Sequence, residues 1–251
     1  MNIAARDLLT SNILGLDAPR ALALLLSSFK DVEEVYLAEL RPVPPLQARR
    51  DPTPAERIVV ERALKYRQST GLAFWDAVLL ELCVVPEAMG LLDEAMIHVT
   101  FHGRERSVPW ASAIADGLER ACAEFSTTSE ANLNFLSEMQ CRDGSKRHVP
   151  MIDFHAACSA TNQRVVSAVA ERLFPEGAVL LESGESYHAY GTRLLSDMEF
   201  YSFLGRALLF APIVDRAYVA HQVIEGRCAL RLTGGGGKSR VPKVIALVPG
   251  K

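Results

Sequence analysis

The sequence has 251 residues, 49% of them hydrophobic, and a formal net charge of −3 at pH 7. A chain of this length and composition can bury a core in one large domain or two small ones. The slight negative charge excludes a generally basic nucleic-acid coat, so any contact with nucleic acid has to come from local clusters. One such cluster is RDGSKRH at 142–148, which contains Arg142, Lys146, Arg147 and His148.

The five cysteines are widely spaced and form no CxxC pair. This pattern is typical of reduced thiols in a cytoplasm and argues against a zinc knuckle or a disulfide framework. The N-terminal stretch carries Arg6 and Asp7 early and shows no small-residue cleavage signal. No apolar stretch reaches the ~20 residues that a membrane span requires. We therefore expect a soluble cytoplasmic protein with no membrane partner.

The first 94 residues have a helical character. Apolar residues recur at helical spacing over 4–41, where a proline-rich linker begins. A new helix is expected after it, with Thr53 as its cap, Pro54 at its first position and Glu56 completing a capping box. Helical character continues to about residue 92. The sequence thus predicts a helical N-terminal region over 1–94, which offers a surface for a protein partner.

Residues 95–251 alternate between strand-like and helical segments, which predicts an α+β domain. The segments are a strand at 95–103, a helix at 110–125, a hairpin around the turn at 142–145 whose second strand ends at Asp153, a helix at 159–174, a strand at 178–182, a long helix at 192–210, a strand ending at Asp215 and a helix at 216–226.

Asp153 and Asp215 each follow an apolar strand-like run. Strand ends hold the backbone firmly while the last side chain meets solvent or ligand, so two converging carboxylates would form an oxygen site for Mg²⁺ or Mn²⁺. The alternative is that each aspartate caps the following helix. The helical pattern of 216–226 favours that alternative for Asp215.

The segment SGESYHAYG at 183–191 carries a tight turn with Ser186 and, two residues later, His188. Hydroxyl and backbone N–H donors there suit an anionic phosphate, although a turn with a structural histidine is the alternative. The glycine run in LRLTGGGGKSR at 230–240 is not a P-loop, because Leu232 stands where a glycine is needed and no helix follows. By itself this run indicates a hairpin turn, with Lys238 able to neutralise phosphate.

The order of these segments resembles the catalytic core of the archaeo-eukaryotic primase superfamily, over roughly 132–248. The most specific part is SGESYHAY, which looks like the family's SG-x-x-x-H-aromatic signature. The resemblance implies an RRM-like primase-polymerase core over 95–251. It also implies that Asp153 and Asp215 bind the catalytic metal, that Ser186 and His188 contact the nucleotide, and that Arg231 and Lys238 contact the triphosphate.

His155 stands where the family usually has a second acid, so it is expected as a third metal ligand; Glu182 or Glu185 are alternatives for the missing carboxylate. The implied function is metal-dependent nucleotidyl transfer from nucleoside triphosphates to single-stranded or primer–template nucleic acid, in DNA replication or repair. One alternative is a degenerate relative that binds nucleotide or single-stranded nucleic acid without turnover. Another is a metal-dependent nuclease using Asp153, His155 and His188. For His98, His102 and His221 we expect packing or surface roles.

Overall fold

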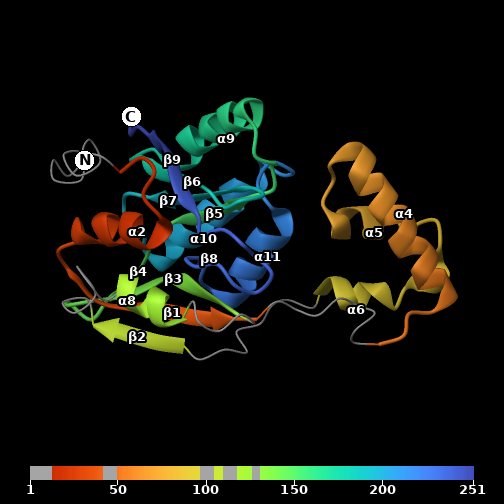
Figure 1. Ribbon diagram of the computed structural model, residues 1–251, viewed down its shortest axis with the longest axis horizontal. Helices are drawn as coiled ribbons and strands as arrows, with labels where there is room; N and C mark the ends of the chain where they lie inside the picture. The colour runs from red at the N-terminus through yellow and green to blue at the C-terminus, as the bar shows by residue number, and fades with distance from the viewer. Residues whose placement is uncertain (1–12, 42–49, 97–104, 110–117, 126–130) are drawn as a thin grey trace. The chain divides into compact units, whose positions relative to one another are not determined.

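The computed structural model describes residues 13–41, 50–96, 105–109, 118–125 and 131–251 (Figure 1). The chain forms two compact units, one from 1–41 with 101–251 and the other from 42–100. The fold class is α+β, as the sequence predicts. The predicted boundary at 94/95 lies close to the second junction of these units. Residues 18–40, predicted as part of a helical N-terminal region, belong instead to the unit that contains the C-terminal residues.

The smaller unit is helical. Its elements are α4 (Pro54–Thr70), α5 (Phe74–Leu82), the short 3₁₀ helix η1 (Pro86–Ala88) and α6 (Leu91–Met96). The expected capping box is present, because the Thr53 hydroxyl accepts the Glu56 N–H and the Glu56 carboxylate accepts the Thr53 N–H. The strand expected from residue 95 is wrong at its start, since α6 covers 95 and 96. Its remainder, with His98 and His102, lies outside the described residues.

The larger unit contains two antiparallel sheets. Its elements are α2 (Ala18–Ser27), β1 (Val32–Leu40), β2 (Glu105–Pro109), α8 (Leu118–Phe125), β3 (Asn132–Cys141), β4 (Lys146–His148), β5 (Met151–Phe154), α9 (Ala160–Leu173), β6 (Ala178–Glu182), β7 (Tyr187–Gly191), α10 (Asp197–Leu208), α11 (Arg216–Glu225), β8 (Ala229–Arg231) and β9 (Lys243–Val248). One sheet has the order β2-β1-β3-β4, with β8 also paired to β3, and the other has the order β5-β7-β6-β9.

The helix expected over 32–40 is wrong, because this segment is β1, paired on one side with β2 and on the other with β3. The register with β3 shifts at two places, between Val32 and Glu34 and between Val35 and Leu37. Such bulges break the strict two-residue alternation that marks a strand. The apolar spacing that remains can also be read as helical, so only the strand pairing decides the conformation.

The four-stranded sheet carries a split β–α–β unit (Figure 1). β5 and β6 are joined through α9, and β7 lies between them, antiparallel to both. α9 packs against β6 and β9 and also contacts α10. This arrangement places the ends of β5 and β6 and the start of β7 at one edge, where the polar side chains predicted for the site gather.

The predicted hairpin around 142–145 is confirmed for β3 and β4, but its second strand does not continue to Asp153 in the same sheet. At Val149 and Pro150 the chain crosses over, and β5 joins the other sheet. The predicted hairpin across the glycine run is wrong. β8 pairs with β3 and β9 pairs with β6, so the run connects the two sheets. The strand predicted to end at Asp215 is also wrong, apart from one bridge between Phe154 and Val214.

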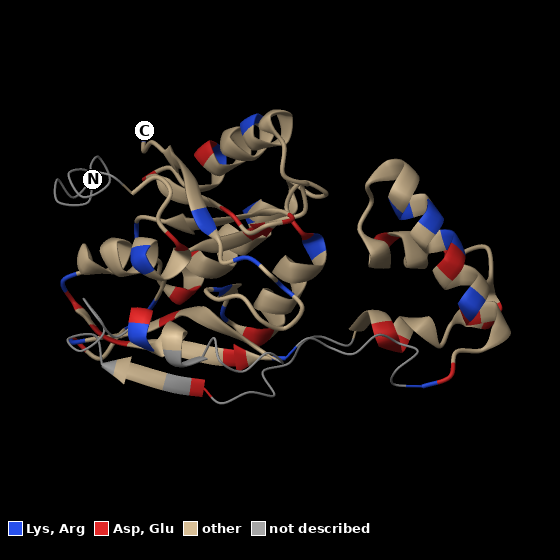
Figure 2. Ribbon diagram, viewed as in Figure 1, with Lys and Arg blue, Asp and Glu red and all other residues tan. Residues whose placement is uncertain are grey.

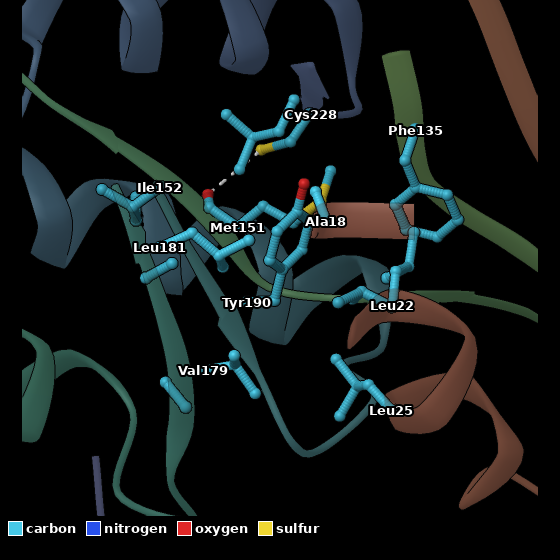
Figure 3. Close-up of a cluster of buried hydrophobic side chains, with 14 of the residues drawn as sticks. Ala18, Leu22, Leu25, Phe135, Met151, Ile152, Val179, Leu181, Tyr190 and Cys228 are labelled. Carbon is cyan, nitrogen blue, oxygen red and sulfur yellow. Dashed lines mark hydrogen bonds between the residues drawn. The ribbon is translucent and has the colours of Figure 1, made fainter. Parts of the chain in front are cut away.

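Both sheets and α2 share one buried cluster (Figure 3). The cluster includes Leu22 and Leu25 of α2, Phe135 of β3, and Val179 and Tyr190 of the other sheet. Burial of large apolar side chains contributes roughly 1.5–3 kcal/mol each. The two sheets are therefore parts of one domain, and the segments that cross between them are held at fixed positions.

Candidate active site

Asp153 lies on β5, directly opposite His188 of β7 in the antiparallel register. Its Oδ1 atom is 3.6 Å from His188 Nε2. This oxygen is buried and has no hydrogen-bond partner, although the side chain as a whole keeps 30% of its exposure. An ionised carboxylate in this position is costly, because burial favours the neutral form.

Asp215 is brought to Asp153 by backbone pairing. Its N–H donates to the Asp153 carbonyl at 3.1 Å, and the N–H of His155 donates to the Ile213 carbonyl at 2.8 Å. The Asp215 carboxylate also caps α11, since Oδ1 accepts the Tyr218 N–H at 2.9 Å. The helix-cap interpretation is thus confirmed, and it holds the side chain in place beside the end of β5.

The two carboxyl groups interact electrostatically. The pKa of Asp153 is raised to about 8, mainly by burial and also by the nearby negative charge of Asp215, while Lys238 and Arg231 oppose the shift. The raised pKa of Asp153 shows that the nearby cations do not offset burial and the charge of the second acid. A cation placed between the two carboxyl groups would relieve both the burial cost and the repulsion.

His155, expected as a third metal ligand, lies beside the carboxylate of Asp215. Its Nδ1 is 4.0 Å from Asp215 Oδ2, and its side chain is 24% exposed. Among the described residues, no three His, Cys, Asp or Glu side chains are gathered as a group able to hold a metal ion. The two aspartates nevertheless fit Mg²⁺ or Mn²⁺, because such an ion is commonly held by one or two carboxylates with water and substrate phosphates completing its shell.

The turn between β6 and β7 carries the serines. The N–H of Ser183 donates to the Ser186 carbonyl at 2.9 Å, and their two hydroxyls are 3.1 Å apart. Gly184 has φ +107°, a conformation that side chains rarely adopt, and an added Cβ would meet the Arg240 side chain. The turn is therefore closed on itself, with half-buried Ser186 facing the Asp153 region.

His188 is part of a strand rather than of a loop, and its side chain is only 7% exposed. Its pKa is lowered to about 3, mainly by burial and also by the positive charges of Arg231 and Lys238. Its imidazole is therefore neutral at physiological pH, so it can meet a phosphate as a hydrogen-bond donor but not as a cation. The Nδ1 atom is buried without a hydrogen-bond partner.

Lys238 lies in a small turn within the glycine run, where the backbone groups of Gly235 and Lys238 exchange two hydrogen bonds. Its Nζ is 2.7 Å from Glu185 Oε2, and both side chains are well exposed. Likewise, the Oε1 atom of Glu182 lies 3.9 Å from Nη1 of Arg240. The two glutamates considered as substitute metal ligands thus face basic side chains of the glycine run.

These segments enclose a cavity of about 180 Å³. Its lining includes Asn134, Asp153, Ser183, Glu185, Ser186, His188, Tyr218, Ala229, Leu230, Arg231 and Lys238. Five of the predicted residues therefore line one cavity, and Asp215 and His155 are not among its lining residues. Sequence reasoning did not identify Asn134 or Tyr218. Asn134 comes from β3 through its pairing with Arg231, which no local motif signals.

No residue of the basic cluster at 142–148 lines this cavity. β8 pairs with β3 at Asn134–Leu136, whereas the turn at 142–145 follows the other end of β3, roughly 25 Å from Asn134 at ~3.3 Å per residue. After the turn, β4 runs back opposite Glu138–Gln140. Figure 2 shows both signs of charge interspersed over this unit. Lys146 pairs with Glu138 at 3.0 Å. The turn of the basic cluster is therefore separated from the residues that line the cavity.

His148 has a structural position. Its Nε2 is 3.0 Å from Asp197 Oδ1, its Nδ1 is 3.3 Å from the Ser137 hydroxyl, and its ring stacks on Phe200 with centroids 4.2 Å apart. This Ser–His–Asp order resembles a hydrolytic triad, but Ser137 is fully buried and no substrate reaches it. His221 lies half-buried on α11, where burial lowers its pKa.

Residues 112–243 match the family described as AEP-like, Archaeo-eukaryotic primase 1D-like. This match spans more than half of the chain and includes every residue proposed for the site. The chain therefore belongs to the archaeo-eukaryotic primase superfamily, as its sequence motifs indicated. No curated protein and no solved structure shows significant similarity to it. None of the helices within the described residues combines the length and apolar character needed to cross a membrane.

Proposed function

We propose that this protein binds a nucleoside triphosphate in the 180 Å³ cavity and transfers the nucleotide to single-stranded or primer–template nucleic acid, with Mg²⁺ or Mn²⁺ as cofactor. The observation that carries the proposal is the pairing of Asp153 with Asp215 beside a cavity that also presents Ser186 and Lys238. Acidic groups for a metal and donors for phosphates are the two components that nucleotidyl transfer requires.

The residues divide into three roles. Asp153 and Asp215 would hold the ion, which when bound supplies charge stabilisation to the transferring phosphoryl group. Lys238 would neutralise phosphate charge, and the Ser186 hydroxyl would donate to a phosphate oxygen. The neutral imidazole of His188, which lies 3.6 Å from Asp153, would donate to a phosphate oxygen of the nucleotide.

An RRM-like core is part of the same proposal. The split unit of β5, α9, β6 and β7 is the arrangement with which such a fold begins. The outer strand β9 pairs with β6, rather than next to β5. All five cysteines are free thiols, which fits a reducing compartment such as the cytoplasm.

The test is a primer-extension assay with Mg²⁺ or Mn²⁺, together with nucleotide binding measured by calorimetry. Wild type is expected to extend a primer, and Asp153→Asn and Asp215→Asn are expected to lose extension while the fold is retained. Asp31→Asn, an exposed aspartate away from the cavity, is the matched control. Extension that survives both substitutions would refute the assignment of the two aspartates.

A second candidate is a nucleotide-binding protein without turnover. It is favoured by His155, which stands where the family usually has an acid and lies against Asp215. Two-metal transfer is helped by carboxylates that hold both ions, and an imidazole brings no negative charge. Nucleotide binding with no incorporation under either metal would select this candidate. Cleavage of a single-stranded oligonucleotide without nucleotide would instead indicate a nuclease.

A further inference from the structure

Arg231 is buried at the end of β8, with only 8% of its surface exposed. Its guanidinium donates three hydrogen bonds to backbone carbonyls. Nη1 donates to Thr233 at 2.6 Å and to Arg240, and Nη2 donates to Ser183 at 2.6 Å. Burial lowers the pKa of Arg231, and Asp153 is among the nearby groups that oppose the shift.

The three carbonyls belong to the two segments that would receive the phosphates. Ser183 begins the serine turn at 183–186, and Thr233 and Arg240 are the two ends of the glycine run at 233–240. The Thr233 hydroxyl in turn accepts the Leu133 N–H at 3.0 Å, which anchors the first end to β3. A flat guanidinium with five N–H donors can join three acceptors at once, whereas an ammonium group of lysine cannot reproduce that fork.

Three of the five N–H groups of Arg231, both on Nη1 and one on Nη2, are thus occupied by the protein backbone. A phosphate that drew away one of these donors would leave a backbone carbonyl without its partner, and Ser183 and Thr233 are buried residues. Lys238, by contrast, pairs with a solvent-exposed carboxylate, that of Glu185. Arg231 is therefore held by backbone carbonyls of the two segments, whereas the half-exposed Lys238 side chain can be reached by a ligand from solvent.

We propose that Arg231 is a positioning residue: it clamps the serine turn to the glycine run and so presents Ser186 and Lys238 to a polyphosphate. This inference rests on the proposed function for its ligand. The clamp itself depends only on the three hydrogen bonds. Four consecutive glycines are expected to be mobile without such a tether, because glycine loses the most conformational freedom on ordering.

The experiment compares Arg231→Lys with Arg231→Ala in binding of inorganic tripolyphosphate and ATP. A direct ionic contact would let the lysine variant keep affinity within about threefold, since the charge remains. The clamp predicts a loss of about tenfold or more in both variants. Arg193→Lys, at an exposed arginine paired with Glu176 and Glu199, is the matched control and should bind as wild type does.

A double-mutant cycle provides a measure that general damage to the fold would not produce. Lys238→Ala should weaken tripolyphosphate binding by about tenfold in the wild-type background but by less than about twofold in Arg231→Lys, because Lys238 is no longer presented. An equal cost of Lys238→Ala in both backgrounds, or wild-type affinity of Arg231→Lys, would overturn the proposal.

Amide hydrogen exchange tests the Arg231 clamp in the absence of any ligand. In Arg231→Lys, exchange should accelerate at the amides of Ser183, Gly235 and Lys238, which are hydrogen-bonded within the two segments, while β5 and β6 stay protected. Unchanged exchange in both segments would refute the clamp. If no variant, wild type included, binds nucleotide or tripolyphosphate, the proposed function fails, and the exchange result still stands on its own.

Discussion

Glu185 offers a gain-of-function test of the cavity. Its carboxylate is 2.7 Å from Lys238 Nζ, in the place that a phosphate oxygen would take. Replacing it by glutamine removes a competing negative charge while keeping the size of the side chain. Because Lys238 is 47% exposed and Glu185 80% exposed, their ion pair contributes little, about 0–1 kcal/mol, and is easily exchanged.

The magnitude follows from the distance. A phosphate bound to Lys238 would stay within about 6 Å of the Glu185 carboxylate, where two unit charges interact by about 0.7 kcal/mol in bulk water and about 3 kcal/mol at the effective dielectric near a protein surface. The high exposure of Glu185 favours the lower part of this range. We therefore expect Glu185→Gln to bind tripolyphosphate or ATP more tightly by about 1 kcal/mol, or roughly fivefold.

Calorimetric titration at about 50 mM and about 500 mM salt measures this gain, which should shrink at the higher concentration because the charges are screened. Glu176→Gln is the matched control, since Glu176 also forms an exposed ion pair, with Arg193 at 3.3 Å, but does not line the cavity. Affinity of Glu185→Gln equal to or below that of wild type at low salt would refute the placement of phosphate at Lys238.

Three further predictions concern the buried polar groups. In metal-free buffer at about pH 9, Asp153→Asn should stabilise the fold by about 2–3 kcal/mol, discounted from the full shift because the side chain is 30% exposed. Because the pKa of Asp153 is raised to about 8, the wild-type protein loses stability as pH rises from about 4 to 8. If urea unfolding shows Asp153→Asn to be less stable than wild type at about pH 9, this reasoning is contradicted. If His155 binds metal, primer extension should favour Mn²⁺, and His155→Asp should shift the preference toward Mg²⁺; no extension by either protein with either ion would leave the binding-protein candidate. Burial lowers the pKa of His148, so unfolding free energy should fall below about pH 6.5, and His148→Phe should make that fall shallower; an equally steep fall would contradict the role of His148.

Several parts of the fold could be predicted because their signals are local. Ser159 caps α9 and Asp215 caps α11, each by accepting the N–H three residues later. Glu56 and Thr53 form their capping box within four residues of chain. Such interactions depend on neighbours in sequence, so residue order is enough to indicate where these helices begin.

The site was predictable in part for a different reason. The turn at 183–186 and the strand with His188 form one hairpin, so Ser186 and His188 keep the spacing that the family signature requires. The position of Asp153 at a strand end was also visible. The placement of Asp215 next to Asp153 was predicted only from the order of the segments. The structure supplies the physical link, which is a hydrogen bond from the Asp215 N–H to the Asp153 carbonyl.

By itself, the sequence determined where α4, α9 and α11 begin, the tight turn at 183–186 and the residue types available for phosphate and metal, because these depend on the nearest few residues. Tertiary structure alone decided that 32–40 is a strand, that β8 and β9 enter different sheets, and that Arg231 faces three backbone carbonyls instead of solvent. Strand pairing and the satisfaction of buried donors join residues that are distant in the chain. For Arg231, the sequence could show a cation near a glycine run, but only the packing of two sheets could show which acceptors surround it.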